Sequence, residues 1–298
     1  MKRLLSLFAL IGVCALTGKA WHLAKDGFSL SRTYASLPSG GFQSFDPSVS
    51  LALQQPYVYL GRGHQCYAFG SADGQYVIKL PRYDRYRLSF FLRSCPISAI
   101  LPYRKAIRDD IEKRQTFLHE SFRLAFEELR DETALVYLHL HRTEHFQHPL
   151  IIKDRIGRVY RLDPNQTAFI LQEKKPIMMA FFQDRLQAGD RKGAEEILDA
   201  FLEVVASRSQ KGIYNKDPSF MRNFGWDGGK GIQIDIGSFY RKSDLPFQEA
   251  RERSFQETIA HVRNWLNEVD KDMLNTFDQK TQMIKASWAA SNSPGSES

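Results

Sequence analysis

Residues 57–80, YVYLGRGHQCYAFGSADGQYVIKL, carry the clearest structural signal in this 298-residue chain. Their aromatic and β-branched residues predict a β-hairpin followed by a third strand, with a turn at Asp73-Gly74. Gly61 and Gly63 occupy the bend of the hairpin, where glycine lets the backbone approach a bulky anion and expose N–H groups to it. Lys79 lies inside an apolar strand, so its ammonium must find a counter-charge or point outward. An ordinary hairpin with an edge lysine would show the same pattern, so the downstream residues must decide between the two interpretations.

The expected elements change from strands to helices along the chain. A long charged helix is expected over residues 103–131, with apolar positions at helical spacing. Strands are then expected at 134–140, 150–153, 158–162 and 169–173, and helices at 177–187 and 191–210. A strand-rich half followed by a helix-rich half predicts an α+β fold of two lobes, with a short hinge near residues 173–176.

Residues 213–237 hold side chains that could carry chemistry. A strand is expected over Ile232–Gly237, with its isoleucines on one face and Asp235 on the other. An aspartate at the end of an apolar strand, just before a glycine, is well placed to hold a metal ion. Asp217 and Asn223, a dozen or so residues upstream, can supply a base and a second oxygen ligand.

Taken together, these segments resemble the protein-kinase-like fold. Leu60-Gly61-x-Gly63-x-x-Cys66-x-Ala68-Phe69 resembles the glycine-rich loop, and Val77-Ile78-Lys79 resembles the strand that carries the kinase lysine. Asn215-Lys216-Asp217 through Asn223 resembles the catalytic loop, and Asp235-Ile236-Gly237 resembles the DFG sequence. The match covers about residues 56–240. The motif sequences also resemble those of an atypical bacterial kinase-like group of unsettled activity. The resemblance implies a two-lobed protein-kinase-like fold, with a β-rich N-lobe and a short helical C-lobe.

The resemblance also implies ATP and Mg²⁺ as cofactors and gives each matching residue a role. The implied phosphate-site residues are Lys79, on the α- and β-phosphates, and the backbone of Gly61, Gly63 and their neighbours up to Tyr67. Asp217 would accept or orient the proton of the attacking hydroxyl, and the metal ligands would be Asn223 and Asp235. The adenine edge would meet Gln172, Glu173 and Lys174.

A kinase lysine usually pairs with a glutamate on the long helix. The candidates are Glu112, Glu120, Glu127 and Glu128. Kinases usually carry an apolar residue one turn after that glutamate, and only Glu120 has one, Leu124. Glu120 is therefore the expected partner of Lys79, although any of these glutamates could simply lie on a solvated helix face.

The chain departs from the kinase pattern in four respects. Cys66 stands where protein kinases have a third glycine, and no histidine precedes Lys216-Asp217. Asn223 is six residues after Asp217, one more than usual, so the loop needs a bulge or a different register. Few ordered residues are expected after Gly237, with one clear helix over about 247–270, which leaves little of the segment that binds peptides in protein kinases.

Two functions fit these residues. The first is an ATP- and Mg²⁺-dependent phosphotransferase acting on an unknown hydroxyl. It is supported by the joint presence of four side chains, those of Lys79, Asp217, Asn223 and Asp235. The alternative is a catalytically inactive kinase-like module that binds a nucleotide or a partner. The short C-terminal part, the shifted asparagine and a signal-like N-terminus favour that alternative.

Two further clusters suggest other sites. His139 and His141 share a strand face and lie near His145 and His148, so two of them could ligate zinc, although no cysteine or carboxylate completes the set. Arg82, Arg85 and Arg87 alternate with Tyr83 and Tyr86 and could contact nucleic acid. A basic solvated turn is the simpler interpretation, so a nucleic-acid partner is not expected. No hydrolase arrangement such as HExxH is present.

The termini are expected to lie outside the folded part. Lys2 and Arg3 precede an apolar run, so residues 1–20 are expected to be a signal peptide or membrane anchor, and the chain membrane-associated or exported. Basic residues on both sides leave the orientation open. The expected divisions are a linker and irregular lead-in at 21–55, an N-lobe at 56–175, a reduced helical C-lobe at 176–275 and a disordered tail at 276–298.

Composition supports a folded body. The chain is 43% apolar and 12% aromatic, which argues against a disordered, fibrous or multi-pass membrane protein. Its formal net charge of +7 suits anionic partners such as nucleotides without selecting among them. Three cysteines without a CxxC pair do not form a disulfide framework.

Overall fold

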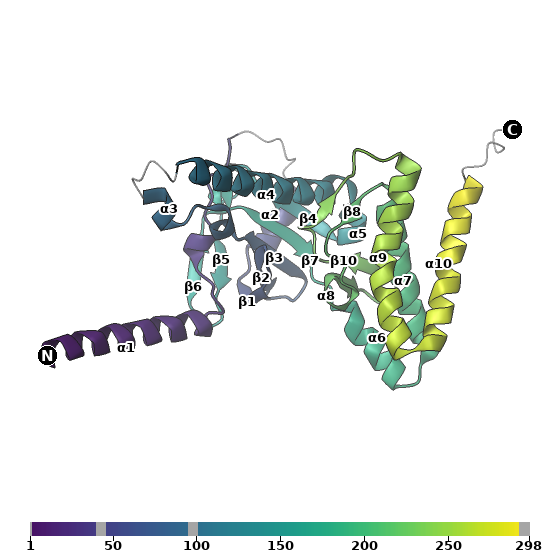
Figure 1. The fold of residues 1–298 in the computed structure, drawn as a ribbon, viewed down its shortest axis with the longest axis horizontal. Coiled ribbons are helices and arrows are strands. Elements are labelled where there is room, and N and C mark those ends of the chain that lie inside the picture. Colours follow the sequence, from purple (N-terminus) through teal and green to yellow (C-terminus); the bar gives the residue numbers. More distant parts are fainter. Residues whose placement is uncertain (1, 40–45, 95–100, 292–298) are drawn as a thin grey trace. The chain divides into compact units, whose positions relative to one another are not determined.

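The computed structural model describes residues 2–39, 46–94 and 101–291, and the chain divides into two compact units (Figure 1). The sheet unit comprises Met1–Thr116 and Val136–Lys174, and the helical unit comprises Phe117–Leu135 and Lys175–Ser298. The predicted fold class is confirmed: the chain is α+β, with a seven-stranded sheet in one unit and most of the long helices in the other. This arrangement is consistent with the two-lobed kinase-like fold that the sequence indicates.

The sheet unit is built on seven strands in the order β4-β7-β3-β2-β1-β5-β6. The strands are β1 Tyr57–Arg62, β2 Cys66–Ser71, β3 Tyr76–Pro81, β4 Leu135–His139, β5 Leu150–Lys153, β6 Val159–Leu162 and β7 Phe169–Glu173. The helices are α1 Lys2–Ala24, α2 Pro47–Leu53, α3 Phe90–Ser94 and the 3₁₀ turns η1 Leu30–Arg32, η2 Tyr83–Tyr86 and η4 Pro164–Gln166. The long helix α4, Leu101–Glu128, contributes residues to both units.

The predicted hairpin and third strand form as expected. β1, β2 and β3 pair antiparallel in sequence order, and a register shift between Tyr59 and Gly61 marks a bulge just before the glycine bend. The Asp73 carboxylate accepts hydrogen bonds from Ser71 Oγ and from the Gln75 N–H, and Gly74 has a φ of +74°, which a side chain would strain. These contacts fix the turn between β2 and β3, and with it the strand that carries Lys79.

Part of the expected linker and lead-in at 21–55 instead belongs to the folded body. Phe28 is 2% exposed and packs edge-on against the rings of Tyr67, Phe69 and Tyr160 at 5.1, 5.4 and 5.6 Å. The Tyr67 hydroxyl also donates to the Gly27 carbonyl at 2.9 Å. A single aromatic residue between breakers has no periodicity, so the sequence pattern does not reveal its burial. The Gly40-Gly41 breakers lie outside the described residues.

A buried ion pair anchors the end of α1 to the sheet unit. Lys25 Nζ lies 2.7 Å from the Tyr160 hydroxyl and 3.2 Å from Asp154 Oδ2. Burial alone would lower the pKa of Lys25, but these hydrogen bonds outweigh it and raise that pKa. The residues of α1 whose exposure is described, 10 and 12–24, are all exposed. Across the described residues, no helix combines the length and the apolarity needed to span a bilayer.

The helical unit combines long helices with three short strand pairings. The helices are α5 Arg130–Thr133, α6 Met178–Gln187, α7 Arg191–Gln210, α8 Phe220–Asn223, α9 Phe247–Val269 and α10 Lys271–Ser291. The strands are β8 Tyr214–Asn215, β9 Phe224–Trp226, β10 Gly231–Gln233 and β11 Phe239–Tyr240. β9 pairs with β10, β8 pairs with β11, and an isolated bridge joins Ile177 to Gly225.

Helices α6, α7, α9 and α10 lie alongside one another and share one apolar core (Figure 1). α7 supplies Phe201, which meets the ring of Phe224 at 4.8 Å. Asp190 caps the first turn of α7 by accepting from the Gly193 N–H, and this bond lowers the pKa of the Asp190 carboxyl. Beyond the end of α7, Gly212 has a φ of +67°, as is common after a helix.

Two expectations for the helical unit are wrong. The expected disordered tail is ordered as far as Ser291, because α10 buries Phe277 and Trp288 in the shared core. Residues 292–298 of that tail lie outside the described residues. The expected strand at 232–237 is shorter: β10 ends at Gln233 and is followed by one further pairing bond, from the Ile234 N–H. After this bond, the Ile236 carbonyl accepts from a side chain of α4 rather than from a neighbouring strand.

Arg208 is fully buried at the end of α7 without an acidic partner among the described residues. It donates to the side chains of Gln233, at 2.8 Å, and Thr258, at 2.5 Å. Burial lowers the pKa of this guanidinium to about 10. Arg208 therefore joins α7 to β10 and α9, and it fixes the strand that leads to Asp235.

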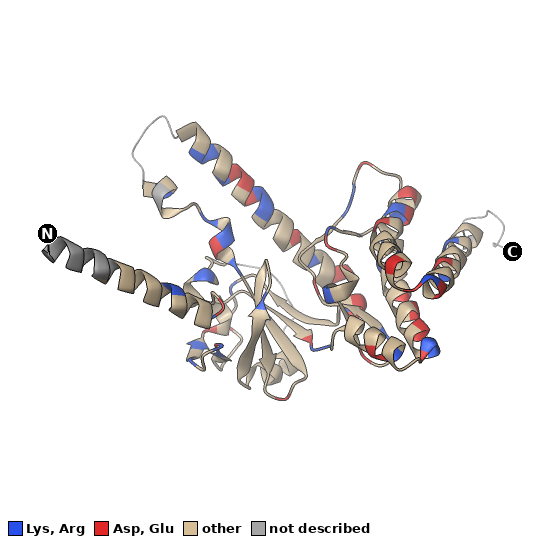
Figure 2. Cartoon of the chain, turned by 60° about the horizontal axis from the view of Figure 1, so that its bottom comes forward, with Lys and Arg blue, Asp and Glu red and all other residues tan. Residues whose placement is uncertain are grey.

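Charged side chains of both signs are mixed along the helices. Figure 2 shows Lys and Arg interspersed with Asp and Glu along α4 and α9. Examples are the ion pairs Arg114–Asp110 on α4, at 2.9 Å, and Arg263–Asp278 between α9 and α10, also at 2.9 Å. Exposed pairs of this kind contribute little to stability. Basic and acidic residues nearly balance on α4 and α9, with nine of one sign and ten of the other, so the net charge of +7 arises elsewhere in the chain.

Candidate functional site

The glycine bend lies between β1 and β2 in the sheet unit. Gly61 pairs with Ala68, and the Gly63 N–H donates to the Cys66 carbonyl at 2.8 Å, which closes the hairpin. A Cβ added at Gly61 would meet no atom within 4 Å, so the space beside this backbone is open. Cys66, which replaces the third glycine of the kinase pattern, is the first residue of β2 and is half-buried. The role of this bend in holding phosphates stays a prediction.

Lys79 lies on β3, the third strand of the unit and the strand position of the kinase lysine. It pairs with Ala68 on β2 and with Ile170 on β7. Its neighbours Ile78 and Leu80 are completely buried, and alternation along a strand puts Lys79 on the opposite face of the sheet. The glycine bend and the lysine thus belong to adjacent strands of one sheet.

The expected adenine-binding segment follows on the other side of β3. Gln172 and Glu173 end β7, where they pair with Val77 and Tyr76 of β3. The Lys174 N–H donates to the Gln75 carbonyl at 2.7 Å. Because the Lys174 N–H is engaged in this bond, an adenine edge would have to meet other backbone groups of the segment.

The expected catalytic loop lies in the helical unit and begins at β8. The Asp217 N–H donates to Asn215 Oδ1 at 2.9 Å, and Asn223 Nδ2 donates to the Asp217 carbonyl at 2.8 Å. The extra residue between Asp217 and Asn223 is taken up by the single turn of α8, in which the Asn223 N–H donates to the Ser219 carbonyl. A short helical turn therefore brings the shifted asparagine to the aspartate.

The same backbone carries Asp235. The Ile234 N–H donates to the Asn223 carbonyl at 2.8 Å, which extends the β9–β10 pairing by one position. Asp235 is the next residue, and its Oδ1 accepts from the Gly237 N–H at 3.2 Å. Asn223 pairs with Ile234 on the neighbouring backbone segment, and Asp235 is the residue directly after Ile234.

Helix α4 reaches this segment through Ser121, a residue that the sequence did not single out. Ser121 is completely buried, and its hydroxyl donates to the Ile236 carbonyl at 2.6 Å and accepts from the Phe239 N–H at 2.7 Å. Glu120, the expected partner of Lys79, is the preceding residue and is exposed. Because Lys79 and Glu120 belong to different units, their ion pair stays a prediction.

Lys216, which precedes the expected base, is also tied to α4. Its ammonium lies 3.6 Å from the ring centroid of Phe117 and 5.3 Å from that of Tyr240, within the range of cation–π attraction. Its backbone N–H donates to the Ser238 carbonyl. The expected catalytic loop, the segment after Asp235 and helix α4 are thus connected by both hydrogen bonds and ring contacts.

The oxygen ligands expected for Mg²⁺ are present. Asn223 commits its amide nitrogen to Asp217, which leaves its amide oxygen to coordinate a cation, and Asp235 has a second carboxylate oxygen. Magnesium is usually held by one or two protein oxygens together with phosphates and water, so this set fits a nucleotide-bound Mg²⁺. Within the described ranges, no group of three or more His, Cys, Asp or Glu side chains could hold a metal by itself.

Of the four histidines, His139 is a packing residue whose two ring nitrogens lie near Thr167 and Thr143, whereas His141 and His148 are exposed. His139 is 1% exposed, with Nδ1 2.8 Å from the Thr167 carbonyl and its ring stacked on Phe169 at 4.9 Å. Burial lowers the pKa of His139 to about 4 and also lowers that of His145. In the arginine-tyrosine segment Arg82 and Tyr83 are buried, whereas Arg85 and Arg87 are exposed and Arg87 donates to the Ser31 carbonyl.

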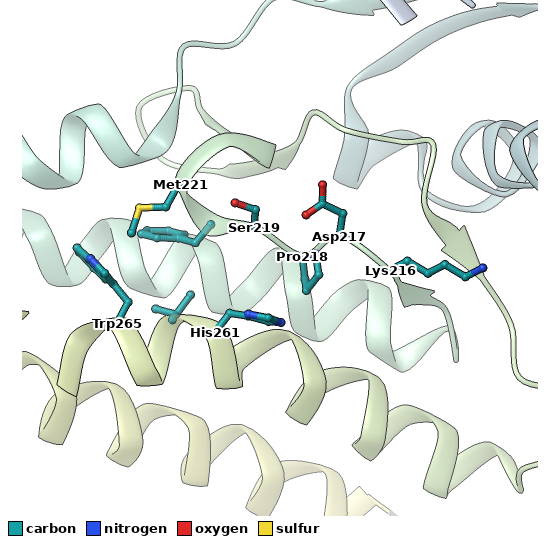
Figure 3. A pocket seen from close by; sticks show the side chains of 9 residues that line it. Lys216, Asp217, Pro218, Ser219, Met221, His261 and Trp265 are labelled. Carbon is teal, nitrogen blue, oxygen red and sulfur yellow. The ribbon is translucent and has the colours of Figure 1, made fainter. Parts of the chain in front are cut away.

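A pocket of about 280 Å³ opens beside the expected catalytic loop. Figure 3 shows Asp217 and Ser219 along one side and His261 and Trp265, from α9, along the other. His261 and Trp265 were not among the residues expected from the sequence. Their spacing of four residues, which puts both on one face of a helix, is the signal that could have identified them.

Comparison with known proteins gives only a distant likeness. No known family matches the chain, and no curated protein matches it. Three solved structures of the bifunctional kinase-methyltransferase WbdD are similar to 65%, 67% and 70% of the chain, at 18%, 16% and 16% identity, with TM-scores of 0.30, 0.32 and 0.35. One of them is a co-crystal structure with the kinase inhibitor LY294002. The chain spans 34–38% of the length of these proteins, and the candidate site rests on its own geometry.

Proposed function

We propose that the chain is an ATP- and magnesium-dependent phosphotransferase that transfers the γ-phosphate to a hydroxyl. The observation that carries the proposal is the bond from the Asn223 amide to the Asp217 carbonyl, continued by the pairing of Ile234 with Asn223. These bonds join the proposed base to both proposed metal ligands over a short stretch of backbone. Phosphoryl transfer depends on positioning and charge neutralisation, so a fixed juxtaposition of these groups is what the protein must supply.

In this proposal each residue has one task. Asp217 accepts the proton of the attacking hydroxyl, while Asn223 and Asp235 hold Mg²⁺. Lys79 and the backbone at Gly61 and Gly63 hold the phosphates, with Glu120 as the partner of Lys79, and the segment at Gln172, Glu173 and Lys174 meets the adenine. Mg-ATP, when bound, would supply the phosphoryl group and a cation that neutralises its charge.

The alternative, a non-catalytic kinase-like module, needs a reason for inactivity. The strongest reason in the sequence was the extra residue before Asn223. The turn of α8 absorbs that residue, since Asn223 still donates to Asp217. We therefore favour catalysis. Thermal shift with Mg-ATP followed by an ATP-turnover assay separates the two functions, because the alternative predicts binding without turnover.

Two substitutions test the phosphate and metal sites. We expect Lys79→Met and Asp235→Ala each to abolish the thermal shift with Mg-ATP, or the turnover, while leaving the protein folded. The matched controls are Lys153→Met and Asp244→Ala, which change exposed residues of the same types and should leave both measurements unchanged. Nucleotide binding that persists in both test variants would remove the assignment of the phosphate site.

A further inference from the structure

The pocket beside Asp217 is small. Its volume of about 280 Å³ lies just below the roughly 300–1,000 Å³ typical of sites for drug-sized ligands, so it suits a single small ring. Its lining comes from the catalytic loop, from α8 and from α9, all in the helical unit. The ammonium of Lys216, which also lines the pocket, is engaged with the ring of Phe117.

One wall of the pocket is a fixed aromatic ring. Trp265 is half-buried, and its indole meets the edge of Phe182 at 5.6 Å and lies 6.2 Å from the ring of Phe220. Val262 is also buried beside it. Rings packed behind an indole limit its rotation, so Trp265 offers a ligand a rigid apolar surface.

Three of the other lining side chains are polar and uncommitted. The carboxylate of Asp217, the hydroxyl of Ser219 and the imidazole of His261 line the pocket from both sides (Figure 3). In the part of the chain that the structure describes, these three side chains make no hydrogen bond or ion pair with other protein groups. They are therefore available to donate to and accept from a ligand that carries several hydroxyls.

We propose that this pocket binds the phospho-acceptor and that the acceptor is a small ring-shaped polyol, such as a monosaccharide unit. Such a ring has an apolar C–H face, which can pack on Trp265, and a rim of hydroxyls, which can bond Ser219 and His261. This inference rests on the proposed function. The acceptor hydroxyl gives its proton to Asp217, and its oxygen forms a bond to the γ-phosphorus of ATP. The bond from that phosphorus to the bridging oxygen then breaks and releases ADP.

The first experiment measures binding without nucleotide. The probes are methyl hexopyranosides and myo-inositol, and binding to the full chain is followed by saturation-transfer NMR. We expect saturable binding of at least one probe, weakened at least about tenfold by Trp265→Ala but only about threefold or less by Trp265→Phe, which keeps an aromatic ring. His261→Ala changes an exposed residue, so it should fold, and it should also weaken binding. Asn264→Ala, exposed on the same helix, is the control and should bind as the unsubstituted protein does.

The second experiment follows ADP release from Mg-ATP with the same probes and with serine- and threonine-containing peptides. ADP release stimulated by a ring polyol and reduced by His261→Ala supports the proposal. The proposal is overturned if no probe binds, if Trp265→Ala and His261→Ala bind normally, or if only the peptides stimulate ADP release. Absence of any thermal shift with Mg-ATP would instead overturn the phosphotransferase function. The polyol-binding measurement alone would then show whether the pocket binds a ring polyol.

Discussion

At the scale of single residues, His139 should make the sheet unit sensitive to acid. Burial lowers its pKa to about 4, whereas an unfolded chain takes up this proton near the ordinary value of 6.5. Between these two values the unfolded state binds more protons, so the folded state loses stability as the pH falls. We expect the free energy of unfolding to drop by about 2 kcal/mol between pH 7 and pH 5 through this residue, as measured by urea unfolding at each pH.

The effect of His139 is isolated by comparing, between variants, the slope of the free energy of unfolding against pH. His139→Gln should be less stable at pH 7 but should lose most of the pH dependence, while His148→Gln, which changes an exposed histidine, should keep it. Neighbouring charges at His141, His145 and Asp163 act on His139 but have smaller effects than burial. An equal slope in the unsubstituted protein and in His139→Gln would contradict a buried neutral imidazole.

Residue types and spacing predicted the components of the candidate site but not its connections. Lys79 was recognisable because a lysine within an apolar strand is unusual, and the structure puts it on β3, between β2 and β7. Ser121 was not recognisable, because a serine in a helix gives no periodic signal. Its importance comes from two backbone groups more than a hundred residues away in sequence, at Ile236 and Phe239.

At the scale of elements, Ser121 joins helix α4 to the turn after Asp235. Ser121→Ala would leave the Ile236 carbonyl and the Phe239 N–H without this partner in a buried position. Each buried polar group left unpaired costs about 1–3 kcal/mol, so we expect the free energy of unfolding to fall by roughly 2 kcal/mol or more. Because the turn also holds Asp235, the thermal shift produced by Mg-ATP should require a higher Mg²⁺ concentration.

Arg123→Ala, an exposed position on the same helix, is the control for Ser121→Ala. It should change neither the free energy of unfolding nor the Mg²⁺ requirement. A loss of stability in Ser121→Ala with an unchanged Mg²⁺ requirement would limit Ser121 to a structural role. That result would show that the contact between Ser121 and the turn does not position the proposed metal ligand Asp235.

Long elements with a clear period were predicted well, and short or irregular ones were not. α7 was expected at 191–210 and is observed at Arg191–Gln210, because its apolar residues repeat at helical spacing. The expected strand at 232–237 is shorter than its alternating isoleucines suggested, and beyond Ile234 the Ile236 carbonyl accepts from a side chain of α4. α10 was missed because its polar surface resembles a solvated tail, while Phe277 and Trp288 meet the core of distant helices.

At the scale of the whole molecule, the chain consists of two units that each bring together part of the proposed site. The sheet unit holds the glycine bend and Lys79, and the helical unit holds Asp217, Asn223 and Asp235. No contact within either unit by itself tests whether Lys79 and Asp235 act on the same nucleotide. The paired substitutions proposed above test it, because both must affect binding of one ligand.

The N-terminal segment can be separated from the fold by truncation. Deleting residues 2–20 should leave the free energy of unfolding unchanged, because the residues of α1 whose exposure is described are exposed. Deleting residues 2–28 also removes Phe28 and the buried Lys25, so it should destabilise the sheet unit strongly. Phe28→Ala, which keeps the chain length, should lower the free energy of unfolding by about 3–5 kcal/mol.

Urea unfolding of these three variants decides where the folded body begins. If the shorter deletion is as stable as the full chain, residues 2–20 contribute nothing to the fold, as a signal peptide or an anchor requires. If it is as unstable as Phe28→Ala, the helix is structural and the prediction of a targeting segment is contradicted. A longer deletion that remains stable would show instead that Phe28 and Lys25 are dispensable, because other side chains can then fill the space beside Tyr67 and Tyr160.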